Sequence, residues 1–184
     1  MLLRPGSSPA RARPAVTGLT ASSYSGVTMR NGVRLAVDVG SVRVGVARSD
    51  PGGILATPLT VVPSGPAAKD ELVKLATDAE AIEVIVGLPT SLSGREGAAA
   101  AAARTFADAL AGRLVPIPVR LVDERFTTVL AHEALRQGGK GGRARRQVVD
   151  QAAAALLLQG ALDAERAAGR PPGEIVPPGP GTEW

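Results

Sequence analysis

Two short apolar strands joined by a tight turn constrain the fold of this chain more than any other feature. The stretch from Leu35 to Asp50 is apolar up to Asp38, turns at Gly40-Ser41, and then alternates valines at 42, 44 and 46 with other residues. This period of two predicts a β-hairpin. A carboxylate inside an apolar strand is costly unless a metal, a phosphate or a base lies near it. Asp38 is therefore a candidate functional residue, and the alternative is that its side chain only caps the turn.

Hydrophobic patterning in the rest of the chain predicts alternating helices and strands. The expected strands are 54–62, 82–87 and 117–122, and the expected helices are 67–79, 97–112, 129–136 and 147–168. Pro58 places the third strand at a sheet edge or at an interruption. The order β-β-β-α-β-α-β-α-α predicts an α/β fold in which a three-strand meander precedes parallel strands and helices pack on a mixed sheet.

The two ends of the chain differ from its middle in composition. Residues 1–30 are rich in Pro, Ser, Gly, Ala and Arg without periodicity, so we expect a disordered, dispensable leader, with Met29 as an alternative start. Residues 169–184 are rich in Pro and Gly and predict a flexible tail. One domain over 31–168 remains.

Charge and composition exclude several classes of protein. Four of the 21 Lys and Arg residues lie in the leader, which leaves 17 basic against 17 acidic residues and no overall basic field for nucleic acid. The absence of Cys excludes disulfides, thiolate metal sites and Cys nucleophiles. No apolar run approaches the roughly 18 residues of a membrane span. Aromatic residues make up only 2% of the chain, which argues against a protein that stacks single-stranded bases.

Acidic residues at the ends of predicted elements are candidate metal ligands. Asp123 and Glu124 end the last predicted strand, and Asp150 opens the last helix on the face of Ala154. Equivalent ends of parallel strands lie side by side, so Asp38 is expected to meet one of the two strand-end acids. Clustered carboxylates repel unless a cation separates them, and with no Cys and one His the ligands must be oxygens, which favours Mg²⁺ or Mn²⁺. Two such ions activate a water and stabilise the leaving oxygen of a phosphodiester.

Each of these acids has a structural alternative. Asp150 could simply favour the helix N-terminus through the helix dipole. Asp123 and Glu124 could form a surface ion pair with Arg125. Glu83 and Glu165 are expected to be ordinary surface charges.

A basic segment among glycines is the candidate contact for nucleic acid. Its cations are Lys140, Arg143, Arg145 and Arg146, in a loop that is expected to be irregular. Such cations release counterions from a phosphate backbone, and the alternative is a loop that is only solvated. Arg43 and Arg125 complete the candidate set. The composition suits recognition of backbone and shape better than base stacking.

Four motifs in order resemble the YqgF (RuvX) family, whose members are ribonuclease-H-like proteins described as Holliday junction resolvases and as pre-16S ribosomal RNA nucleases. The resemblance covers about residues 33–166. The motifs are Asp38-Val-Gly-Ser-Val-Arg-Val-Gly-Val-Ala47, Val86-Gly-Leu-Pro89 with Gly94, Asp123-Glu-Arg-Phe-Thr-Thr128, and Asp150-Gln-Ala-Ala153 with Leu158-Gln159.

The resemblance implies an RNase H-like fold, a mixed five-stranded sheet with helices on both faces. It also implies a cytoplasmic, Mg²⁺- or Mn²⁺-dependent endonuclease that acts in 5′-end processing of pre-16S ribosomal RNA. Asp38 matches the first-strand metal ligand and Asp150 the acid on the final helix. Related resolvases carry a Glu at the end of the fourth strand, but this chain has Gly87-Leu-Pro89 there. Asp123 or Glu124 would substitute, and the sequence leaves that choice open.

Other functions remain as alternatives. The expected partner is structured RNA or branched DNA, without a membrane, and the expected state is a monomer or a weak homodimer. A Holliday junction resolvase would need two sites on a two-fold dimer. A non-catalytic, RNA-binding ribosome-assembly factor would keep the fold but not need Asp38. Actin-like ATPases share an Asp-x-Gly turn but need two such domains, for which this chain has no room.

Overall fold

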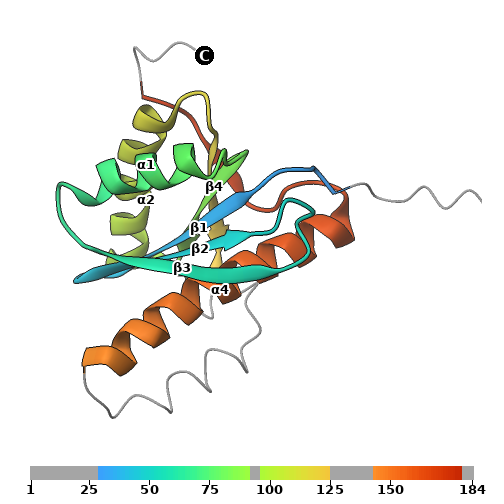
Figure 1. Cartoon of the computed structure of the whole chain (residues 1–184). Coiled ribbons are helices and arrows are strands. Elements are labelled where there is room, and N and C mark those ends of the chain that lie inside the picture. The colour runs from blue at the N-terminus through green and yellow to red at the C-terminus, as the bar shows by residue number, and fades with distance from the viewer. Residues whose placement is uncertain (1–28, 92–95, 125–142, 180–184) are drawn as a thin grey trace, which may run out of the picture.

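A six-stranded mixed sheet with helices on both faces makes up the described part of the chain (Figure 1). The computed structural model describes residues 29–91, 96–124 and 143–179, with side chains for all of these except 143–151. The strands are β1 (Arg34–Val39), β2 (Arg43–Ser49), β3 (Ala56–Pro63), β4 (Glu83–Leu88), β5 (Val119–Asp123) and β6 (Glu174–Val176). The helices are α1 (Ala68–Asp78), α2 (Ala98–Leu114) and α4 (Arg143–Ala168).

The strand order confirms the predicted fold class. Within the sheet the order is β3-β2-β1-β4-β5-β6. The pairs β1–β2 and β2–β3 are antiparallel, and β1–β4 and β4–β5 are parallel. This is the meander followed by parallel strands that the hairpin and the alternating elements predict. Pro58 lies in β3, which is an edge strand as expected because proline cannot donate a ladder hydrogen bond.

The predicted boundaries of the domain were wrong at both ends. Residues 174–176 form β6, which pairs antiparallel with β5 and makes a sixth strand where five were expected. Val176 is 3% exposed and belongs to the core, so the segment up to residue 176 is part of the fold instead of the predicted tail. At the other end, Arg30 binds Glu83 and Glu165 and therefore belongs to the domain rather than to the leader. Residues 1–28 lie outside the described part.

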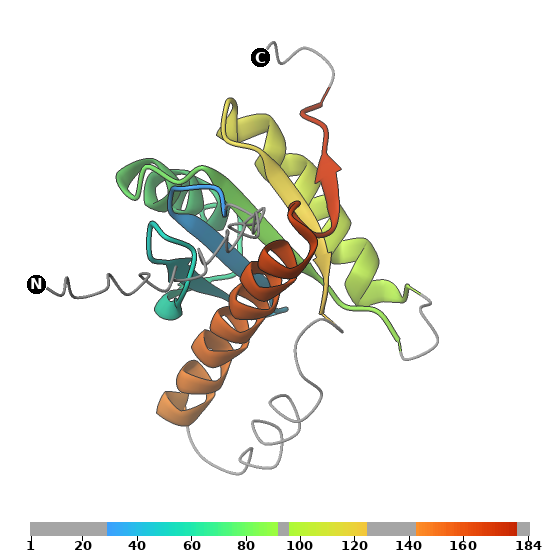
Figure 2. The same ribbon diagram turned by 90° about the vertical axis from the view of Figure 1, so that its right-hand side faces the viewer.

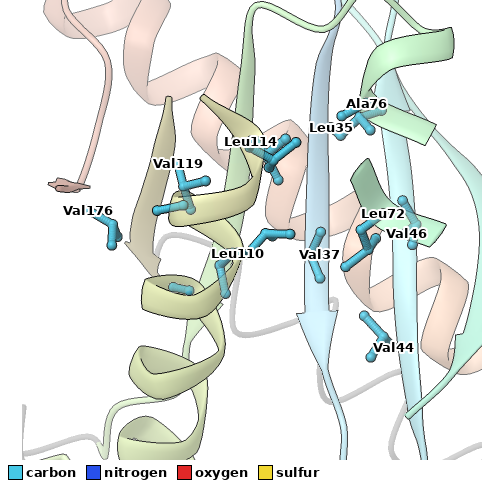
Figure 3. Packing of buried hydrophobic residues seen from close by; sticks show 14 of the residues in the cluster. Leu35, Val37, Val44, Val46, Leu72, Ala76, Leu110, Leu114, Val119 and Val176 are labelled. Carbon is cyan, nitrogen blue, oxygen red and sulfur yellow. The ribbon is translucent and has the colours of Figure 1, made fainter. Parts of the chain in front are cut away.

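Two hydrophobic cores lie on opposite faces of the sheet. One face packs against α1 and α2, and the other packs against α4 (Figures 1 and 2). Strand alternation divides β1 between them: Leu35 and Val37 point to α1 and α2, as Figure 3 shows, whereas Ala36 points to α4. Asp38, two residues after Ala36, therefore lies on the α4 side.

Helix α4 begins four residues earlier than the sequence predicts. Arg143, Arg145 and Arg146 are helical instead of belonging to an irregular loop. The reason is that Arg is a good helix former and no glycine follows until Gly160. Asp150 consequently lies about two turns inside the helix. The helix-dipole alternative for Asp150 loses its basis, because that effect decays within the first turn. No helix among the described residues is both long and apolar enough to span a membrane.

A buried network of ion pairs joins α4 to the N-terminal ends of the parallel strands. Glu83 on β4 accepts from Arg30 at 2.9 Å and from Arg120 at 3.0 Å. Glu165 on α4 accepts from Arg30 at 2.7 Å and from Arg34 at 3.1 Å. The expectation that Glu83 and Glu165 are surface charges was wrong, since they are only 1% and 5% exposed. Burial of these carboxylates is possible because each meets two guanidinium groups.

Candidate active site

Acidic side chains gather at the opposite end of the sheet, where β1, β4 and β5 finish. Val37 pairs with Val86 in the parallel register of β1 and β4, so Asp38 is level with Gly87. Gly87 in turn pairs with Val122 on β5. The strand ends therefore lie side by side, as expected, with β4 between Asp38 and the acids that end β5.

Glu124 reaches across β4 beneath α4. The position that a Cβ atom on Gly87 would occupy lies 2.8 Å from Glu124 Oε1 and 3.4 Å from Glu124 Cγ. The same position lies 3.1 Å from Leu157 Cδ2 of α4. The Glu124 carboxylate thus occupies the space over β4 that a side chain at residue 87 would fill, on the side of the sheet that carries Asp38.

The electrostatics of Glu124 agree with this position. Burial raises the pKa of its carboxyl group to about 7, with further contributions from the negative charges of Asp38 and then Asp123. With a pKa of about 7, the carboxyl group of Glu124 is roughly half protonated near neutral pH. Asp38 and Asp123 are therefore close enough to Glu124 for their negative charges to oppose its ionisation.

Asp123 is held on the other side of the strand. Thr90, just after β4, donates its hydroxyl proton to Asp123 Oδ1 at 2.7 Å. Alternation places Asp123 with Leu121, which packs in the core of α1 and α2, and places Glu124 with Val122, which packs against α4. The two acids that sequence could not tell apart thus differ in environment: Glu124 shares its side of the sheet with Asp38, and Asp123 is bound to Thr90.

The fourth predicted acid, Asp150, lies on α4. It precedes Ala154 by four residues and Leu157 by seven, which is the spacing of one helix face. Ala154 is fully buried and Leu157 is 3% exposed, so this face of the helix meets the sheet. The side chain of Asp150 lies outside the described residues. Among side chains that the structure does describe, no group of three acidic or His residues is arranged to hold a metal ion.

The structure describes only some of the basic residues that are predicted to contact nucleic acid. Arg43 opens β2, and its carbonyl oxygen accepts from Gly40 N at 2.9 Å, which closes the hairpin turn beside Asp38. Arg143, Arg145 and Arg146 lie in the first turns of α4, which extend past the sheet in both views (Figures 1 and 2). The structure describes the backbone of these arginines but not their side chains. Arg125 and Lys140 fall outside the described ranges.

Sequence reasoning missed Gly87 and Thr90 as parts of this site. A glycine within an apolar strand often marks a close approach of another group, so Gly87 carried a usable signal. Nothing in the sequence pointed to the hydrogen bond from Thr90 to Asp123, because it joins residues 33 positions apart.

Comparison with known proteins gives consistent family matches. A model of the RuvX family, described as Holliday junction resolvase, matches residues 32–164. A protein of Thermobifida fusca named "Putative pre-16S rRNA nuclease" is 61% identical over 155 residues, which cover 80% of this chain and 98% of that protein. A protein of the same name from Streptomyces coelicolor is 56% identical over 153 residues, 82% of this chain and 92% of that one. Among solved structures, T. thermophilus RuvC in complex with a Holliday junction substrate is 14% identical with a TM-score of 0.46, over 77% of this chain and 99% of that one.

Proposed function

Because this chain belongs to the RuvX family, we propose that it is a divalent-metal-dependent endonuclease that hydrolyses phosphodiester bonds in precursor 16S ribosomal RNA. The names of its relatives support the substrate. The observation that carries the chemistry is the approach of Glu124 to Asp38 across β4, which contributes to raising the pKa of Glu124 to about 7. Precursor ribosomal RNA is a cytoplasmic substrate in bacteria, so the same proposal assigns the protein to the cytoplasm.

Asp38 and Glu124 are the proposed metal ligands from the sheet, and Asp150 is the proposed ligand from α4. The fit rests on the donor set: carboxylate oxygens that oppose one another's charge are the ligands that Mg²⁺ and Mn²⁺ prefer. When bound, such ions supply an activated water and stabilise the leaving oxygen. Asp123 has a different role in this proposal, since its hydrogen bond to Thr90 fixes the end of β5 from which Glu124 extends.

The chain's own cations would position the nucleic acid. Arg43 stands at the start of β2, next to the turn that follows Asp38. We assign to Arg43, to Arg125 and Lys140, and to the arginines at 143, 145 and 146 the neutralisation of backbone phosphates, which orients a substrate without reading its sequence. Neutralising the three arginines of α4 should reduce the salt dependence of RNA binding. An unchanged slope of log K against log salt would exclude them from the interface.

The decisive experiment compares two substrates with the purified full chain. Precursor 16S ribosomal RNA and a synthetic four-way DNA junction are incubated with and without Mn²⁺, using the wild type and the Asp38→Asn variant. We expect Mn²⁺-dependent cleavage of the RNA that the variant loses while remaining folded. Equal cleavage by the variant and the wild type would refute the metal site.

Cleavage of the DNA junction is the second candidate function, favoured by the description of the family model. Resolution of a junction needs two active sites related by a two-fold axis. Paired, symmetric cuts by a dimer would therefore support this alternative, and a monomer that cuts only RNA would exclude it. If the wild type binds the RNA without cutting it, the protein is a non-catalytic assembly factor.

A further inference from the structure

The two strands that flank Asp38 both place a glycine beside it. Gly45 on β2 is the direct antiparallel partner of Asp38, and Gly87 on β4 is level with it in the parallel register. Cross-strand neighbours point to the same side of a sheet, here the side of α4. The positions level with Asp38 on both flanking strands therefore carry no side chain, whereas the same side of the sheet carries Ala36, Ala47 and Ile85 further along the strands.

Of these two glycines, Gly87 is the one on the strand that lies between Asp38 and Glu124. Asp38 lies on β1 and Glu124 follows β5, and β4 lies between them. Two strand spacings amount to roughly 9.6 Å, so the side chain of Glu124 has to pass over β4 to approach Asp38. Glu124 Oε1 lies only 2.8 Å from the position of a Cβ atom at residue 87.

The backbone conformation at residue 87 does not require a glycine. The residues with positive φ among those described include Gly53 and Gly173 but not Gly87, so an alanine at residue 87 would have no backbone strain. Its cost would come from the atoms above it, Glu124 Oε1 and Leu157 Cδ2, both at the ends of flexible side chains. The fold can accommodate an alanine there if one of these two groups moves.

We propose that Gly87 is a positioning residue for the metal site. Because residue 87 has no side chain, the carboxylate of Glu124 can lie over β4 on the side of the sheet that carries Asp38. A methyl group at residue 87 would hold Glu124 back on β5 and separate the two ligands. This inference rests on the proposed function in one respect, namely that the group the carboxylates hold is a divalent cation.

The test measures Mn²⁺ binding by titration calorimetry on the purified full chain, with cleavage kinetics as a second readout. Gly87→Ala should weaken Mn²⁺ binding by roughly tenfold or more and lower kcat, while KM for the RNA and the urea midpoint in EDTA stay near wild type. Gly112→Ala is the matched control, because a Cβ atom there meets no atom within 4 Å. Wild-type Mn²⁺ affinity in Gly87→Ala would overturn the inference.

A double variant separates positioning of Glu124 from displacement of α4. If alanine acted by pushing Leu157, then Gly87→Ala/Leu157→Val would regain Mn²⁺ affinity, and the inference would be wrong. If alanine acts on Glu124, the double variant stays as weak as the single one. A wild type that binds Mn²⁺ without cleaving RNA would refute the proposed function, and calorimetry would still decide this inference. A wild type without Mn²⁺ affinity would refute both.

Discussion

Replacing Glu124 by Gln should stabilise the metal-free protein while abolishing its cleavage activity. The carboxyl group of Glu124 has a pKa of about 7 in the folded protein, against 4.5 as its ordinary value. Between these pH values the folded state keeps a proton that the unfolded state has released. Stability therefore falls as the pH rises from about 4.5 to about 7, and the full penalty applies above that. A glutamine side chain at this position has nearly the same shape without the charge, so the Glu124→Gln substitution removes the penalty.

The size of the effect follows from the pKa difference. Raising a pKa from 4.5 to about 7 costs at most ~3.4 kcal/mol at about pH 8. Because Glu124 is partly exposed to water, screening reduces this to roughly 1–2 kcal/mol. For a domain of this size that corresponds to an increase in Tm of roughly 3–6 °C at about pH 8. Below about pH 4.5 the charge is absent in both states, and the difference between variant and wild type should vanish.

The assay is thermal unfolding in EDTA, followed by circular dichroism at about pH 4.5 and about pH 8. Asp108→Asn on the exposed face of α2 is the control for loss of one negative charge, and it should melt like the wild type at both pH values. Adding Mn²⁺ should raise the Tm of the wild type more than that of the Glu124→Gln variant. A variant that is no more stable than the wild type at the higher pH in EDTA would show that neither burial nor the charges of Asp38 and Asp123 penalise the Glu124 carboxylate.

Three further predictions concern the rest of the fold. Glu83→Gln leaves Arg30 without one of its carboxylates and should cost about 3 kcal/mol in urea unfolding, whereas Arg113→Ala, which breaks an exposed pair, should change little. Burial opposes ionisation of Glu165, but guanidinium groups outweigh it and hold its pKa below the ordinary value, so its stabilisation should be present above about pH 4.5 and lost on further acidification. Gly112→Ala in α2 should add about 0.5–1 kcal/mol to stability by calorimetry, since the site is open and helical.

The meander was predictable because the valines of its second strand alternate with other residues and its first turn carries glycine. β6 was not, because three residues between glycine and proline give no period. Burial of Glu83 and Glu165 was also invisible, since a single Glu in a helix or at a strand start looks like surface charge until its partners are known. The proposal of Glu124 rather than Asp123 as a ligand rests on the side of the sheet that carries α4, which only the three-dimensional arrangement gives.

The two ends of the sheet are connected by α4, and this bears on the geometry of the site. Glu165 fixes the helix to Arg34 at one end of β1, and Asp38 lies four residues, about 13 Å, further along that strand. Asp150 lies 15 residues before Glu165, about 22 Å along the helix axis. Because the ion pairs of Glu165 and the contact of Leu157 with β4 both set the register of α4 on the sheet, they also set where Asp150 stands relative to Asp38. The stabilising charges at one end thus help to set the distance between the backbone positions of Asp150 and Asp38 at the other end.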